Sequence, residues 1–196
     1  MPLAFPSGMR LRLASRFAVL PVILNFLSAV VLSANTPIRV DVDRVVDKVY
    51  VVDASFDVNV PQHIAWEVLT DYEDIGRFVS SIRHSTVKHR EADRVVIEQH
   101  GVGKAFIVSV PVHVVLDIRE QDRRIVAFRD LCGKSFSTYE GRWEIIATAD
   151  GTRVKYLLKA DPSGRQPAML ARSALRSCVK KLLDEVRTEM LARAMR

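Results

Sequence analysis

Apolar and polar residues alternate one by one along residues 38–58. Ile38, Val40 and Val42 alternate with charged residues, and the stretch from Tyr50 to Val58 repeats the pattern. A period of two predicts strands with one buried and one solvated face. An Asp-Gly pair at 150–151 is typical of a tight hairpin and favours antiparallel neighbours. Further alternating runs lie near 82–89, 94–101, 104–118, 123–131, 135–148 and 152–160.

The run "FIVSVPVHVVLDI" at 106–118 is the longest of these predicted strands. Proline has no N–H to donate to a neighbouring strand, so Pro111 predicts a sheet edge or a bulge. Ser109, His113 and Asp117 fall on the polar face. The opposite, apolar face carries Phe106, Val108, Val110, Val112, Val114, Leu116 and Ile118.

Two short helices are predicted after the first alternating stretch. Pro61 suits the first position of a helix that runs to Leu69. "TDYE" at 70–73 fits a capping box with Thr70 as N-cap, which predicts a second helix from Asp71 to about Ser80.

One long helix is predicted from Pro167 to Ala194, because no residue in this range breaks a helix. At about 1.5 Å per residue it would be about 40 Å long. Its single apolar stripe must be buried, and the apolar face of the strands is the obvious partner. The pattern therefore predicts an α+β fold. The stripe consists of Leu175, Val179, Leu182, Val186 and Met190.

Residues 1–34 differ in composition from the rest of the chain. Three arginines and no acid precede the apolar stretch "FAVLPVILNFLSAVVLSA" at 17–34. This order is typical of a secretory signal peptide, although 18 residues also approach the length of a membrane anchor. Both interpretations place a single domain, residues 35–196, outside the cytoplasm, either free in the periplasm or anchored facing it.

Charge is distributed unevenly over the domain. Residues 165–196 carry a net charge of +5, whereas residues 35–164 carry −2. The sequence lacks the basic stripe with stacking aromatics that is typical of nucleic-acid binding, so no nucleic-acid partner is expected. The basic C-terminal helix has two interpretations, an ordinary solvated face or a peripheral contact with an anionic membrane surface.

Sequence motifs for catalysis are missing from the chain. There is no Gly-x-Ser-x-Gly elbow, phosphate loop or dinucleotide fingerprint, so no cofactor and no catalytic residue is expected. The five histidines do not fall at ligand spacing on one face, and no metal site is expected. Cys132 and Cys178 are too few for a disulfide framework, and either pair with each other or serve as small buried residues.

The order of these elements resembles the helix-grip fold of the START-like or polyketide cyclase/dehydrase superfamily, including its coenzyme Q-binding branch. The resemblance rests on residues 54–82, 106–118, "YEGRWEI" at 139–145 and "YLLKADP" at 156–162. It implies a curved antiparallel sheet of about six to seven strands wrapped around the long helix, with two short helices after the first strand. It also implies an apolar cavity between sheet and helix, closed by the short second helix.

The residues expected to line this cavity follow from strand phase, from the helix stripe and from the second short helix. Polar groups on an apolar inner face need a partner, which a ligand could supply. Ordinary core packing is the alternative interpretation for each of these residues. The expected ligand-binding residues are Tyr72, Phe78, Gln99, Val108, Val110, Val112, Val114, Tyr139, Trp143, Tyr156, Leu175, Val179 and Leu182.

Two functions from different classes are consistent with the sequence. The first is non-catalytic binding or transport of a hydrophobic molecule such as a lipid, isoprenoid, quinone or polyketide-like compound. The second is a cyclase or dehydrase that acts on a polyketide-like substrate in the cavity. A third role, in protein association, resembles the ribosome-associating toxins of the coenzyme Q-binding branch, and the predicted export argues against it.

Overall fold

The computed structural model describes residues 37–46, 48–105, 108–162 and 168–196. The predicted export segment, residues 1–34, and Phe106 lie outside these residues. The helices are α1 (Gln62–Leu69), α2 (Ile75–Phe78) and α3 (Ala168–Ala194). The strands are β1 (Arg39–Val46), β2 (Val49–Val58), β3 (Ile82–Glu91), β4 (Arg94–Ala105), β5 (Val108–Gln121), β6 (Ile125–Asp130), β7 (Phe136–Thr148) and β8 (Gly151–Pro162).

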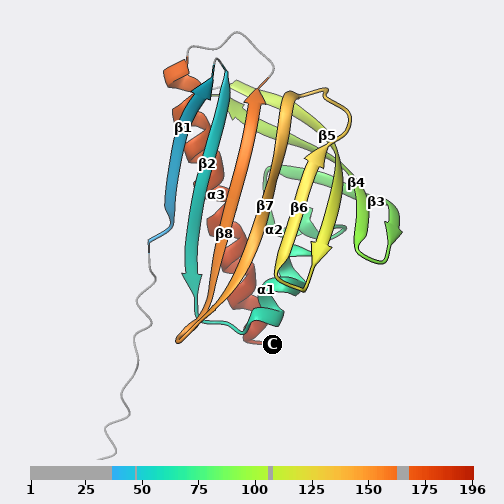
Figure 1. Cartoon of the computed structure of the whole chain (residues 1–196), viewed down its shortest axis with the longest axis vertical. Coiled ribbons are helices and arrows are strands. Elements are labelled where there is room, and N and C mark those ends of the chain that lie inside the picture. Colours follow the sequence, from blue (N-terminus) through green and yellow to red (C-terminus); the bar gives the residue numbers. More distant parts are fainter. Residues whose placement is uncertain (1–36, 47, 106–107, 163–167) are drawn as a thin grey trace, which may run out of the picture. The chain divides into compact units, whose positions relative to one another are not determined.

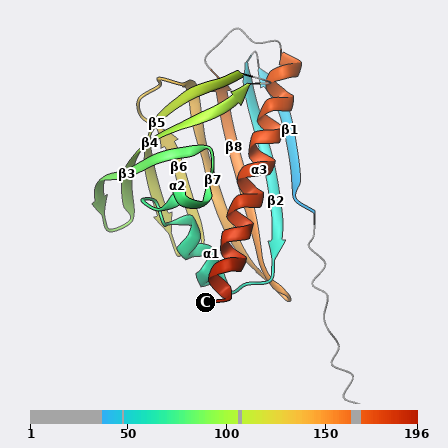
Figure 2. The same ribbon diagram turned by 180° about the vertical axis from the view of Figure 1, so that it is seen from behind.

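All the described strands form one antiparallel sheet in the order β1-β2-β8-β7-β6-β5-β4-β3. The sheet curves, and α3 lies along one of its faces, behind the strands in Figure 1 and in front of them in Figure 2. This arrangement confirms the predicted α+β helix-grip fold. The sheet has eight strands, against the predicted six or seven, because the first alternating stretch folds back on itself as the β1–β2 hairpin. The short helices therefore follow the second strand.

Pro111 lies at a sheet edge, as predicted. Residues Leu116–Gln121 of β5 pair with β6, whereas the half that contains Pro111 pairs with β4 alone. On the side away from β4, the N–H groups of His113 and Val115 donate to Ser135 Oγ and Asp130 Oδ1. Pro111 lies two and four residues before His113 and Val115, so its backbone nitrogen faces the same side of β5. No described strand pairs with β5 on that side at this point, and the missing N–H therefore removes no ladder hydrogen bond.

The predicted capping role of Thr70 is wrong. Thr70 closes α1, since its backbone N–H and its hydroxyl both donate to the carbonyl of Trp66. The residue before α2 is Asp74, and α2 is a single turn that begins at Ile75. A Ser/Thr residue can satisfy carbonyls at a helix end as well as N–H groups at a helix start, and the local pattern does not distinguish the two.

The buried stripe of α3 differs slightly from the predicted one. Val179, Leu183, Val186 and Met190 are fully buried, whereas Leu182 is half-buried. Leu183 was not predicted, although the spacing 179, 183, 186, 190 fits a helix face as well as the chosen stripe does. None of the helices in the described residues combines the length and apolarity needed to cross a membrane.

Candidate functional site

An aromatic cluster occupies the inner face of the central strands, which is the face turned toward α3. Trp143 on β7 and Tyr156 on β8 are register partners, with ring centroids 4.3 Å apart. Phe136 stacks on Tyr139 at 4.6 Å, and Phe128 on β6 lies 5.6 Å from Tyr139. Strand phase alone predicted the shared face of Tyr139, Trp143 and Tyr156, since alternate residues of paired strands point the same way.

The side chains of Tyr139 and Tyr156 lie close enough to affect the pKa of each other's phenol. Burial raises the pKa of both phenols, and the neighbouring Tyr139 raises that of Tyr156 further. Both side chains therefore stay protonated at neutral pH. They can donate a hydrogen bond to a ligand oxygen but cannot act as a base.

The inner face is not uniformly buried. In the sheet, α3 packs closely against β1, β2 and β4, whereas α1 packs against β7 and β8. Between these contacts, several apolar side chains of the central strands and of α3 pack against the core yet keep part of their surface exposed. A partly exposed apolar surface of this kind can bind a hydrophobic ligand. These side chains are Val112, Phe136, Tyr139, Trp143, Leu175 and Leu182.

The remaining predicted site residues divide between core and rim. Val114, Tyr156 and Val179 are fully buried, whereas Val110 is 40% exposed at the open end of β5. Gln99 has a partner within the protein, since its amide nitrogen donates to Ser85 Oγ on β3 at 3.2 Å. The side chain of Val108 lies outside the described residues.

The segment that holds Tyr72 and Phe78 is anchored at several points. Tyr72 is buried and its hydroxyl donates to Glu120 on β5, while Phe78 is half-buried beneath the guanidinium of Arg193. Ser80 donates from its backbone N–H and its hydroxyl to the carboxylate of Glu185 on α3, at 3.1 and 2.6 Å. This short segment, residues 71–80, therefore contacts both the sheet and the C-terminal half of α3.

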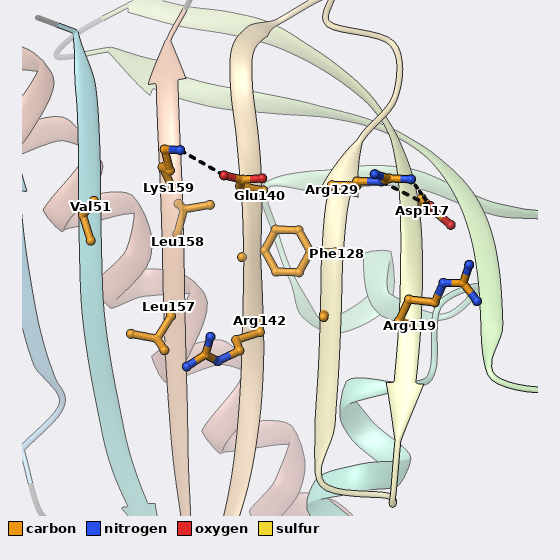
Figure 3. A pocket seen from close by; sticks show the side chains of 12 residues that line it. Val51, Asp117, Arg119, Phe128, Arg129, Glu140, Arg142, Leu157, Leu158 and Lys159 are labelled. Atoms are coloured by element: carbon orange, nitrogen blue, oxygen red, sulfur yellow. Dashed lines mark hydrogen bonds and ion pairs between the residues drawn. The ribbon is translucent and has the colours of Figure 1, made fainter. Parts of the chain in front are cut away.

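A hollow of about 690 Å³ lies on the other side of the sheet, away from α3. Figure 3 shows charged side chains around it, with the ring of Phe128 visible between β6 and β7. Most of these charges are paired with each other, including Lys159 with Glu140 and Arg129 with Asp117. The hollow is lined by Val51, Asp117, Arg119, Ala127, Phe128, Arg129, Glu140, Gly141, Arg142, Leu157, Leu158 and Lys159.

Asp117 at the edge of this hollow is a buried carboxylate that the sequence assigned to a wet face. Arg94 Nε donates to it at 2.6 Å, and Arg129 Nη2 at 3.1 Å. The bond to Arg94, together with the smaller contribution of Arg129, outweighs burial and lowers the pKa of Asp117. Its two partners lie on β4 and β6, so sequence spacing could not identify them.

Two of the five histidines, which the sequence did not bring together, lie side by side in the sheet. His100 and His113 are register partners on β4 and β5, and their rings stack at 4.2 Å beside Glu98. Together these three side chains form the only group within the described residues whose ligand atoms are close enough to hold a metal ion. By contrast, Cys132 is a half-buried free thiol, so the alternative of a Cys132–Cys178 disulfide is not realised.

Comparison with known proteins gives a family match over most of the chain. A family model described as "Polyketide cyclase / dehydrase and lipid transport" matches residues 50–191. Among curated proteins, no sequence matches the chain.

Several solved structures share the fold at low identity. The protein TTHA0849 from Thermus thermophilus superposes with a TM-score of 0.65 and 19% identity, covering 74% of this chain and 99% of that chain. A STAR-related lipid transfer protein from Xanthomonas axonopodis gives 0.60 and 14%, covering 77% and 98%. The ZhuI aromatase/cyclase of a Streptomyces species gives 0.59 and 16%, covering 76% and 94%. At these identities the likeness shows the fold alone.

Proposed function

Because the chain belongs to the polyketide cyclase/dehydrase and lipid transport family, we propose that it is a non-catalytic binding protein for a hydrophobic small molecule. The observation that carries this proposal is the partly exposed apolar and aromatic surface between α3 and the central strands. Each 100 Å² of such surface that a ligand buries would contribute about 2.5 kcal/mol to uptake.

The proposed ligand is a lipid, an isoprenoid or a quinone. Trp143 and Phe136 are partly exposed aromatic side chains, against which a planar ring can pack. Tyr139 is half-buried beside them, and its hydroxyl can bind a carbonyl or hydroxyl oxygen. A quinone has both features, which also supports a place in the coenzyme Q-binding branch.

A cyclase or dehydrase is the second candidate, and the Tyr139–Tyr156 pair is the observation that favours it. Two protonated phenols on an apolar face could donate hydrogen bonds to a substrate carbonyl as charge develops there. Proton removal needs a base as well, and the raised pKa values exclude these phenols from that role. Binding without chemistry therefore accounts better for the polar groups of this face.

Two further parts of the proposal concern access and location. Residues 71–80 would act as a gate, since they form a short segment whose helix is a single turn. The N-terminal 34 residues would export the domain to the periplasm or anchor it there. The basic residues of α3 could then contact anionic lipids during ligand exchange, with Lys180 as one exposed example.

The test is native mass spectrometry, with solvent extraction, of the domain purified from the envelope of its own host. A lipid, isoprenoid or quinone bound in a one-to-one ratio is the expected result. An empty protein that also fails to take up an added fluorescent fatty acid or a soluble quinone would contradict the proposal.

Three variants locate the binding face. Val112→Asp puts a charge on the proposed inner surface and should abolish uptake, whereas Ser109→Asp, on the opposite face of the same strand, should not. Leu157→Asp adds the same charge to the outer hollow. Loss of uptake in Leu157→Asp together with normal uptake in Val112→Asp would assign the ligand to the outer face instead. Circular dichroism of each variant shows whether it folds.

A further inference from the structure

Glu98, His100 and His113 meet on the face of the sheet opposite the proposed ligand surface. Glu98 and His100 are alternate residues of β4, so their side chains point the same way, and His113 is the direct β5 partner of His100. The Nε2 atom of His113 lies 3.0 Å from Glu98 Oε1, and the Nε2 atom of His100 lies 3.6 Å from the same oxygen. All three ligand atoms lie within 4.8 Å of one another.

These separations suit a shared metal ion. Zinc binds imidazole nitrogen and carboxylate oxygen at about 2.0–2.2 Å, which for tetrahedral angles places two ligand atoms about 3.3 Å apart. The observed nitrogen–oxygen separations of 3.0 and 3.6 Å lie on either side of that value. The rings of His100 and His113 stack with an interplanar angle of 19°, so a modest rotation of at least one ring must aim both nitrogens at the ion. His100 can make this rotation because its side chain is 52% exposed.

Neighbouring groups hold the cluster in place without occupying the ligand atoms. Lys88 on β3 contacts the other carboxylate oxygen, Glu98 Oε2, at 2.8 Å, which leaves Oε1 turned toward the histidines. The backbone N–H of His113 donates to Ser135 Oγ at 2.9 Å and fixes this part of β5. The ligands thus project from two paired strands, and strands position ligands more rigidly than loops do.

We propose that Glu98, His100 and His113 form a binding site for a divalent first-row transition metal that binds imidazole, such as zinc. Two nitrogens and one carboxylate oxygen are a ligand set that suits zinc, copper or nickel and not calcium or magnesium. Three protein ligands leave a fourth position for water or an external ligand. The site lies on the outer face of the sheet and does not depend on what binds beside α3.

An ordinary ion pair is the competing explanation, and the chain contains one for comparison. His89 contacts Glu91 at 2.8 Å on β3, both side chains being more than half exposed, and no third ligand joins them within the described residues. The His89–Glu91 pair is therefore a surface contact between a histidine and an acid, with no third ligand atom in the described part of the chain close enough to share a metal ion. It therefore provides the matched control for the proposal.

The experiment is a titration of the metal-free domain with Zn²⁺ alone, by isothermal calorimetry and by competition with a chromophoric chelator. One Zn²⁺ per chain is expected to bind with a micromolar or lower dissociation constant. His100→Ala, His113→Ala and Glu98→Gln should each weaken binding by about tenfold or more, since even outer partners of a metal ligand are worth that much. His89→Ala should leave the affinity unchanged.

Two results would overturn the proposal. One is the absence of saturable one-to-one binding in the unmodified domain. The other is binding that survives His100→Ala and His113→Ala unchanged while both variants keep the thermal unfolding temperature of the parent domain. Substitution with Co²⁺ adds a separate check, because its visible absorption reports the ligands. Thiolate charge-transfer bands that disappear in Cys132→Ser would assign the ion to the cysteine instead.

Discussion

The hydroxyl of Tyr72 donates a 2.9 Å hydrogen bond to Oε1 of Glu120, joining the connection between α1 and α2 to β5. Burial, and to a smaller extent the charge of Glu120, raise the pKa of Tyr72 far above neutral pH, so the hydroxyl remains a donor. Tyr72→Phe should keep the packed ring and lose this bond. We expect a loss of about 1–2 kcal/mol in the free energy of unfolding, because the acceptor is charged. Urea denaturation measures it.

Glu120→Ala supplies the control for that bond. Glu120 also lies 3.6 Å from Arg90, so its removal has a cost of its own. If the hydrogen bond is the source of the effect, Tyr72→Phe should cost much less in the Glu120→Ala background. An equal cost in both backgrounds would show that the hydroxyl of Tyr72 stabilises the fold through a contact other than the one with Glu120.

Release of the bound molecule should depend on the contact between Ser80 and Glu185. Both bonds of Ser80 go to this one carboxylate, so Glu185→Ala frees residues 71–80 from α3 at that point. Given the proposed gate, we expect release of a fluorescent fatty acid to become roughly three- to tenfold faster, because two exposed charge-assisted bonds are lost. Stopped-flow displacement measures the rate.

Asp184→Ala is the matched control for the gate. It removes the neighbouring acid of α3, whose carboxylate pairs with Arg187 on the same helix. Release should then proceed at the parent rate. An equal acceleration in both variants would indicate a general loosening of α3 instead of a gate.

Gly141 is required by the close contact of β7 with β8 and β6. A Cβ at this position would lie 2.2 Å from the carbonyl oxygen of Leu157 and 2.8 Å from Cζ of Phe128. Gly141→Ala should therefore destabilise the domain by about 3 kcal/mol or more. Gly103→Ala is the control, since its Cβ would lie 3.3 Å from Val112 Cγ2 and 3.9 Å from the carbonyl oxygen of Val110, and it should change the stability by less than about 1 kcal/mol. Thermal unfolding compares the two variants.

The periodic features of the fold could be predicted from the sequence because they are local. Alternation places Tyr139, Trp143 and Tyr156 on one face whichever strands are neighbours, and the spacing of apolar residues identifies the buried side of α3. How much of that face stays exposed depends on where α3 lies across the sheet. The sequence does not reveal the position of α3 on the sheet. It therefore predicted lining residues without separating Val114, which is buried, from Val112, which is partly exposed.

The side-chain clusters on the outer face of the sheet went unpredicted because they depend on strand register. His100 and His113 are 13 residues apart in sequence, and only the β4–β5 pairing brings them together. The partners of Asp117 likewise come from two neighbouring strands. Register is set by turn geometry and by the summed fit of many side chains, which a single sequence does not reveal residue by residue.

Asp117 should make the stability of the domain sensitive to acid. Its pKa in the folded protein lies below the value of about 3.9 that is typical of an unfolded chain, so the ionised carboxylate stabilises the fold above that pH. This contribution is lost as the pH falls through the lowered pKa. Asp117→Asn should therefore cost about 1–3 kcal/mol at pH 7, and the difference from the parent should shrink as the pH falls below about 4. Asp93→Asn removes a carboxylate that is 67% exposed and should cost little at either pH. Urea unfolding across this pH range measures both, and a cost for Asp117→Asn that does not change with pH would show that its charge is not what stabilises the sheet.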